Sequence, residues 1–251
     1  MADIENGVLK RYRKDRKEER VVLPKGITEI GDHAFEDCDF IQTIEIPDSV
    51  TAIGNCAFEG CSGLRSIVIP HSVQTMGGGL FFGCTSLESF AIPDGFKRIG
   101  DGTFSCCVNL KNVYIPDSVE TIGMQAFYEC KSLKQICISE NVRRMGYQTF
   151  AGCEALRHIE IHRAVADIAE GVFIGCKALK TAVVPYIARY MFVDCGSLTD
   201  VWVTNDGTYT ENDYKTNTAF ENCKALKNIW VLRDNGKKAF SNTVKYLDLN
   251  E

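Results

Sequence analysis

The feature that most constrains this chain is a phenylalanine that recurs every 23 residues, with a cysteine three residues after it each time. A fixed period of this length is typical of repeat proteins, in which each unit forms one coil of a stack. The spacing changes only near the C-terminus, so we expect about nine coils. The phenylalanines are Phe35, Phe58, Phe81, Phe104, Phe127, Phe150, Phe173, Phe192 and Phe220, and the cysteines are Cys38, Cys61, Cys84, Cys107, Cys130, Cys153, Cys176, Cys195 and Cys223.

The residues within one unit predict its local structure. Residues 67–69, Ile-Val-Ile, alternate so that the outer side chains point inward and the middle one outward, as in a short strand. Pro70 ends this strand, because proline cannot donate to a sheet. Val50 and Ile53 form a second short extended piece. Residues 55–61 are too few for a stable helix and favour a 3₁₀ turn.

The residue before the repeated cysteine predicts a left-handed turn. It is glycine, aspartate or asparagine in seven of nine units, and these types tolerate a positive φ. Cys106 and Glu129 are exceptions. Because one unit cannot bury its own apolar stripe, we expect the coils to stack and share one core. In a representative coil the predicted core residues are Leu64, Ile67, Ile69, Val73, Met76, Phe81 and Cys84.

Blocks such as IPDSVTAIGNCAFEGCSGL (46–64) and IPDSVETIGMQAFYECKSL (115–133) resemble the leucine-rich repeats of the BspA-like bacterial group, over about residues 21–232. The predicted fold is thus a leucine-rich-repeat solenoid, a right-handed stack. It has short parallel strands on a concave face and 3₁₀, short helical or extended segments on the convex face. The resemblance implies adhesion and protein binding at bacterial surfaces, and it supplies no catalytic residues.

The ends of the chain depart from the repeat. We expect residues 1–20 to form an N-terminal cap, residues 21–232 the solenoid and residues 233–251 a C-terminal cap. The polar stretch 205–217 lacks the ligand spacing of a calcium loop and is expected to be a surface loop.

The composition of the chain limits the classes of binding partner that can be expected. With 28 basic and 33 acidic residues the net charge is −5, which favours no nucleic-acid partner. No apolar run reaches the length of a membrane span, so no membrane insertion is expected. The N-terminus lacks the apolar segment of a secretory signal, which predicts a cytoplasmic location. If a signal was removed, a secreted or cell-surface location becomes the alternative.

The repeated cysteines are predicted to be reduced, small core hydrophobes, since stacked coils set them farther apart than a disulfide prefers. The histidines do not repeat with the cysteines at zinc-ligand spacing, so no metal site and no cofactor is expected. Three cysteines lie outside the series: Cys56 and Cys106 on the convex side and Cys137 in a concave strand. Exposed thiols there fit a reducing compartment.

Three functions are compatible with this pattern. The first is a non-enzymatic scaffold that binds a protein or glycan on the concave strand face, as in cell adhesion. The second is a purely structural spacer or repeat array. The third is a thiol-dependent enzyme at Cys137, with His158 diagonal to it one coil on, although no oxyanion site is evident.

The outward strand positions predict where binding occurs. Both tryptophans of the chain fall at this position in neighbouring coils, and such aromatic side chains are enriched at binding hot spots. An alternative is that a C-terminal cap covers them. The predicted binding residues are Tyr114, Trp202, Trp230, Val68, Glu160 and His158.

Overall fold

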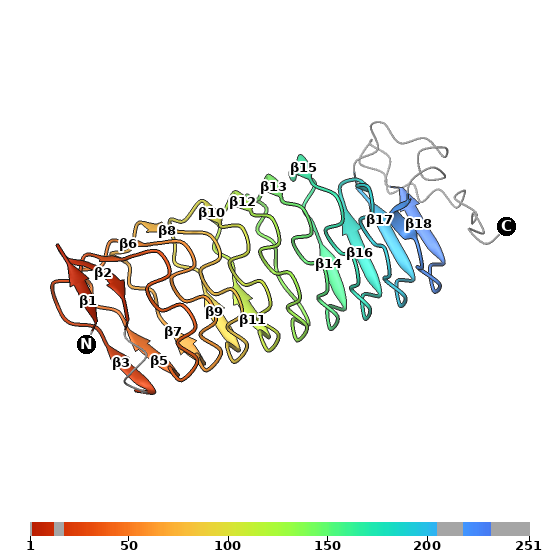
Figure 1. Cartoon of the computed structure of the whole chain (residues 1–251). Helices are drawn as coiled ribbons and strands as arrows, with labels where there is room; N and C mark the ends of the chain where they lie inside the picture. The colour runs from red at the N-terminus through yellow and green to blue at the C-terminus, as the bar shows by residue number, and fades with distance from the viewer. Residues whose placement is uncertain (1, 13–17, 205–217, 232–251) are drawn as a thin grey trace.

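The computed structural model describes residues 2–12, 18–204 and 218–231. Figure 1 shows an elongated stack of coils that follow one another in chain order, from the N-terminus at one end to β18 at the other. These are the stacked coils predicted from the 23-residue period, in the leucine-rich-repeat fold that the family resemblance implied.

One ladder of short parallel strands runs along one side of the stack (Figure 1). It divides into three sheets, β3-β5-β7, β9-β11 and β14-β16-β17-β18. We call the solvent-facing side of this ladder the strand face; it is the face predicted to be concave. Its strands are β3 (Arg20–Val22), β5 (Thr43–Glu45), β7 (Ser66–Ile67), β9 (Ser89–Ala91), β11 (Asn112–Tyr114), β14 (His158–Glu160), β16 (Thr181–Val184), β17 (Asp200–Val203) and β18 (Asn228–Val231).

The coil that carries Cys137 contributes no strand to this ladder, so the prediction that Cys137 lies in a strand is wrong. One backbone hydrogen bond in this region joins the coil to the next one: the Lys134 carbonyl accepts from the Arg157 N–H at 3.2 Å. One such bond does not make a strand pair, because a ladder needs repeated bonds in register.

A second ladder confirms the predicted second extended piece. Apart from β2, each strand of this ladder is two residues long. The strands pair in parallel in two sheets, β2-β4-β6-β8 and β10-β12-β13-β15. The short antiparallel strand β1 (Asp3–Glu5) extends the first of these sheets by pairing with β2. The bounds are β2 (Val8–Arg11), β4 (Glu29–Ile30), β6 (Ala52–Ile53), β8 (Thr75–Met76), β10 (Arg98–Ile99), β12 (Thr121–Ile122), β13 (Arg144–Met145) and β15 (Asp167–Ile168).

The β1-β2 hairpin lies at the open end of the first coil. Strand β2 pairs with β4 on the side opposite β6 and so covers an edge that would otherwise be unpaired. Leu9 is fully buried, and the ring of Tyr12 stacks on Phe35 with centroids 5.1 Å apart. That residues 1–20 act as a separate cap remains a prediction, and the predicted cap 233–251 lies outside the described residues.

The turns between the ladders are tight and rarely helical. The 3₁₀ helix η1 (Thr218–Phe220) is the one helix in the described ranges, and the other coils close with i→i+3 bonds such as Cys38 N–H to Phe35 O at 3.0 Å. A positive φ precedes the repeated cysteine in all nine units, including Cys106 (φ 60°) and Glu129 (φ 57°). Their N–H groups donate to the next coil at 2.7 and 2.8 Å, and the stack therefore imposes the left-handed turn even on these residue types.

A second left-handed position, four residues earlier in the coil, was not predicted. Glycine occupies it in three coils, but non-glycine residues adopt a positive φ there in five. We call this the first-turn position, and two of its residues, His33 and Cys56, are possible metal ligands. The residues are His33, Cys56, Gly79, Gly102, Gln125, Gln148, Gly171 and Tyr190.

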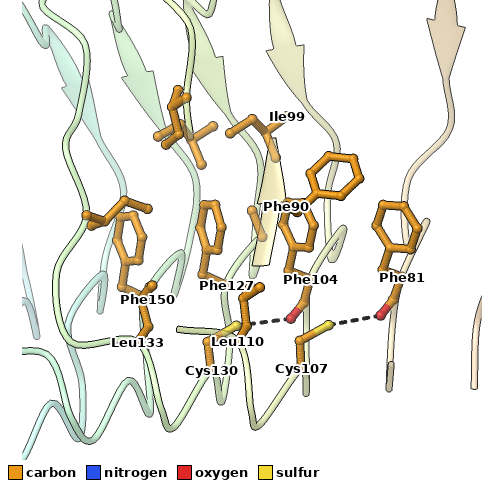
Figure 2. Packing of buried hydrophobic residues seen from close by; sticks show 14 of the residues in the cluster. Phe81, Phe90, Ile99, Phe104, Cys107, Leu110, Phe127, Cys130, Leu133 and Phe150 are labelled. Atoms are coloured by element: carbon orange, nitrogen blue, oxygen red, sulfur yellow. Dashed lines mark hydrogen bonds between the residues drawn. The ribbon is translucent and has the colours of Figure 1, made fainter. Parts of the chain in front are cut away.

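The repeated phenylalanines form a continuous stack through the core, part of which is drawn in Figure 2. Neighbouring rings have centroids 5.1–5.7 Å apart, and their planes lie within 22° of each other. Of the predicted core residues in the third coil, Met76 alone is only half-buried. It borders a small hollow that Gly77 and Phe90 also line.

Candidate binding surface

The strand face exposes alternate residues of each strand. In β9 the buried Phe90 lies between exposed Ser89 and Ala91, and in β14 the buried Ile159 lies between exposed His158 and Glu160. This follows from the two-residue side-chain period of a strand. The predicted binding residues that lie in strands therefore all face away from the core.

Register brings several of these residues together at the C-terminal end. Glu160 pairs with Val183, Val183 with Trp202, and Trp202 with Trp230, so the four form one row across adjacent coils. His158 lies two residues before Glu160 on the same face. We call His158, Glu160, Val183, Trp202 and Trp230 the tryptophan patch.

Two other predicted binding residues lie on the same face but outside the patch. Val68 and Tyr114 are 78% and 61% exposed. Tyr114 is four coils away from Trp202, which at about 4.8 Å per coil is roughly 19 Å. The predicted site thus divides into exposed apolar side chains in the N-terminal half and a compact patch in the C-terminal half.

A row of polar residues, His158, Thr181, Asp200 and Asn228, lies beside the row that contains the tryptophans. His158 Nδ1 lies 2.6 Å from the Thr181 hydroxyl, and the Asn228 side chain donates to the Asp200 carboxylate at 2.6 Å. Burial alone would raise the pKa of Asp200, but hydrogen bonds from Asn228, Thr199 and Trp230 outweigh it and lower that pKa. Asp200 is therefore ionised at neutral pH and lies near Trp230, while both tryptophans are half-buried.

The Cys137–His158 pair does not form a catalytic dyad here. Cys137 is exposed, and His158 uses Nδ1 toward Thr181, in the coil on the opposite side. Among the hydrogen bonds of the described residues, none joins Cys137 to His158. A cysteine nucleophile needs a base within hydrogen-bond reach, so this arrangement does not activate the thiol.

Comparison with known proteins decides the family. A model described as a BspA type leucine-rich repeat region (6 copies) matches residues 11–131, 97–227 and 184–250. The chain belongs to the BspA-type leucine-rich-repeat family. No curated protein matches the sequence. In the described ranges, no helix is long and apolar enough to cross a membrane.

Solved structures of leucine-rich-repeat proteins share the fold. A leucine-rich cell surface protein from Faecalibacterium prausnitzii is 21% identical, with a TM-score of 0.54, and the match covers 93% of this chain and 95% of that one. A leucine-rich-repeat protein from Bacteroides ovatus is 22% identical, with a TM-score of 0.50 and coverages of 90% and 71%. At these identities the likeness shows the fold alone.

The repeated cysteines do more than the hydrophobic filling predicted for them. From the second coil onward, each thiol donates to the carbonyl of the phenylalanine in the preceding coil, at 2.9–3.2 Å. Figure 2 shows two of these bonds, from Cys107 to Phe81 and from Cys130 to Phe104. These bonds join successive coils, so no spacing within one unit could have indicated them.

All twelve cysteines are free thiols, as predicted for the repeated ones. Burial raises the pKa of several of the repeated cysteine thiols, for example that of Cys130. The expectation that Cys56 and Cys106 are exposed is wrong, since both are half-buried in the turns; Cys137 is exposed as expected.

One group of metal-ligand side chains comes together despite the lack of zinc-ligand spacing in the sequence. His33, Cys56 and Glu59 place one ligand atom each within 4.8 Å of one another. Zinc-ligand spacing is recognised from residues that are close along the chain, whereas the stack brings together residues, such as His33 and Cys56, that are 23 apart.

Proposed function

We propose that this protein is a binding scaffold whose recognition surface is the tryptophan patch. The observation that carries the proposal is that Trp202 and Trp230, the two tryptophans of the chain, pair in register on adjacent strands and both keep part of their surface exposed. Tryptophan buries a large area for little loss of side-chain entropy, which is why it is enriched in binding hot spots.

The charge around the indoles favours a particular partner chemistry. Glu160 is exposed in the same row, and Asp200 is ionised beside Trp230. Indole faces attract cationic groups, and carboxylates strengthen that attraction. We therefore propose a protein partner that presents lysine or arginine next to apolar side chains. A glycan is the alternative, since paired indoles also suit a sugar ring.

A capture experiment tests this proposal. The intact chain is immobilised and incubated with extract of the source cells, in parallel with a Trp202→Ala/Trp230→Ala variant. Tyr114→Ala serves as the matched control, because it removes an exposed aromatic from the same face outside the patch.

We expect a partner retained by the wild type and by Tyr114→Ala to be lost by the double tryptophan variant. Free polylysine peptide should compete for binding and a neutral oligosaccharide should not. Equal retention by all three proteins would contradict recognition at the patch and favour the spacer role. Competition by the sugar alone would favour a glycan ligand.

The location of the protein belongs to the same proposal. The comparisons give no support to the predicted cytoplasmic location, and the cell-surface location of the Faecalibacterium protein is compatible with surface recognition here. Free thiols fit a surface in an anaerobic setting as well as a reducing cell interior. We propose the surface, and protease treatment of intact source cells tests it: digestion before lysis supports the proposal, and protection until lysis contradicts it.

A further inference from the structure

His33, Cys56 and Glu59 lie in the turns of two adjacent coils near the N-terminal end, away from the tryptophan patch. His33 follows β4, and Cys56 follows β6 at the equivalent first-turn position one coil on. Glu36 and Glu59 occur three residues after them, again at equivalent positions. The stack thus sets a His-Glu pair directly beside a Cys-Glu pair.

The distances among these side chains are close to those of a metal site. His33 Nδ1 lies 3.7 Å from a Glu59 carboxylate oxygen and 3.5 Å from one of Glu36. The ligand atoms of His33, Cys56 and Glu59 are all within 4.8 Å of one another. In a tetrahedral zinc site, bond lengths of about 2.0–2.3 Å set ligand atoms about 3.3–3.6 Å apart. Small side-chain adjustments close this difference.

The local charge also favours a cation. Burial and the negative charges of Glu59, Glu36 and Asp32 raise the pKa of the Cys56 thiol to about 11. Burial is the largest of these causes, and the Glu59 hydrogen bond is the next. A negative potential that opposes a thiolate attracts a divalent cation, which in turn stabilises that thiolate.

The fold itself does not require these residue types. The first-turn position holds glycine in three coils and glutamine in two, and the position three residues later holds Phe82, Ser105, Tyr128 and Ala151 in the following coils. Gly79, the counterpart of Cys56 in the next coil, leaves room for its sulfur, because a side chain there would begin 2.7 Å from it.

We infer that His33, Cys56 and Glu59 form a binding site for a divalent transition metal of the zinc type, with Glu36 or water as the fourth ligand. One nitrogen, one sulfur and one or two oxygens are a ligand set that zinc accepts. Bound metal would join the first two coils beside the β1-β2 hairpin. The site is independent of the proposed recognition surface.

Metal titration of the reduced, chelator-treated full chain tests this inference. We expect one equivalent of Co²⁺ to produce a thiolate-to-cobalt charge-transfer band, and Zn²⁺ to displace it. The test variants use residues that the fold already accepts at the same position in other coils: His33→Gln, Cys56→Gly and Glu59→Ser. Cys106→Ser and Cys137→Ser are the matched controls.

Cys56→Gly should abolish the band, and the other two test variants should weaken Zn²⁺ binding about tenfold or more, since even indirect partners of a metal commonly contribute about 10–100-fold. The two control variants should bind like the wild type. A wild type without the band, or a band that persists in Cys56→Gly, would overturn the site. Circular dichroism of each variant separates loss of binding from loss of the fold.

Discussion

The thiol of Cys130 donates a hydrogen bond to the carbonyl oxygen of Phe104, one coil earlier, at 3.1 Å. Both residues are fully buried, so this carbonyl has no access to water. The equivalent bond recurs from coil to coil, and it favours cysteine over a small residue without a donor, such as alanine, after each phenylalanine.

This relationship predicts different effects for two substitutions of similar size. Cys130→Ser keeps a donor, whereas Cys130→Ala leaves the Phe104 carbonyl with one hydrogen bond, from the backbone N–H of Cys107 at 3.1 Å. The net contribution of one hydrogen bond is about 0.5–1.5 kcal/mol, so we expect Cys130→Ala to be the less stable variant by about 1 kcal/mol. Urea unfolding followed by circular dichroism measures the difference. Equal stability of the two variants would mean that the thiol acts only as a hydrophobe.

The phenylalanine stack makes a second prediction. Phe127 is fully buried, with ring centroids 5.3 Å from Phe104 and 5.1 Å from Phe150. Phe127→Ala should lower the free energy of unfolding by about 3–5 kcal/mol, because it removes a large side chain and leaves a cavity. Substitution of exposed Tyr147 by Ala in the same region is the control and should cost little. A loss below about 1 kcal/mol for Phe127→Ala would contradict the role of the stack in stability.

The thiols predict a third result, in their reactivity with alkylating agents. The thiolate is the reactive form, and a raised pKa lowers its fraction at a given pH. In the native, metal-free chain at neutral pH, exposed Cys137 should be alkylated while the buried ladder cysteines are not. Denaturation without reductant should then expose all twelve thiols, which mass spectrometry counts. An unmodified pair would reveal a disulfide and contradict the stacked geometry.

The same reasoning gives Cys56 its own pH dependence. Because burial and Glu59 raise its pKa to about 11, its alkylation rate should keep increasing as the pH rises toward 11. Glu59→Gln removes the nearest negative charge, so the pKa should fall and the rate at pH 8 should increase. Glu140→Gln, an exposed carboxylate elsewhere, is the control. An unchanged rate in Glu59→Gln would show that Glu59 does not act on the thiol.

The sequence predicted those parts of the molecule that repeat. The 23-residue period gave the coils, the two extended segments and the core, since each depends on residue types that recur in every unit. It also predicted the left-handed turn before seven of the nine repeated cysteines. Cys106 and Glu129, the two exceptions, adopt the same turn, and their N–H groups donate to the next coil.

Contacts between coils explain most of what the sequence did not reveal. The thiol-to-carbonyl bonds and the approach of His33 to Cys56 depend on how one coil lies on the next, and no spacing within a unit encodes them. The missing strand at Cys137 has a similar origin, because pairing depends on the backbone of both neighbours. The outward strand positions of the candidate binding residues could be predicted from the sequence, whereas the interaction of Asp200 with Trp230 required the structure.

The interaction between Asp200 and Trp230 leads to a prediction about the tryptophan patch. Trp230 is one of three hydrogen-bond partners that lower the pKa of Asp200, after Asn228 and Thr199. Trp230→Phe keeps an aromatic ring but removes the indole N–H, so the ionised carboxylate loses a donor and the pKa of Asp200 should rise. Trp202→Phe is the matched control, because Trp202 is not among the groups that shift this pKa.

Carbon-detected NMR titration of the aspartate carboxyl groups measures the pKa of Asp200 in the wild type and both variants. We expect the titration midpoint of Asp200 to move to higher pH in Trp230→Phe and to stay in place in Trp202→Phe. Trp230 would then be a positioned side chain whose indole is held by an ionised carboxylate, which reduces the entropy lost when a partner binds. If the midpoint moves equally in both variants, the change comes from general exposure of the patch, and Asp200 does not hold Trp230.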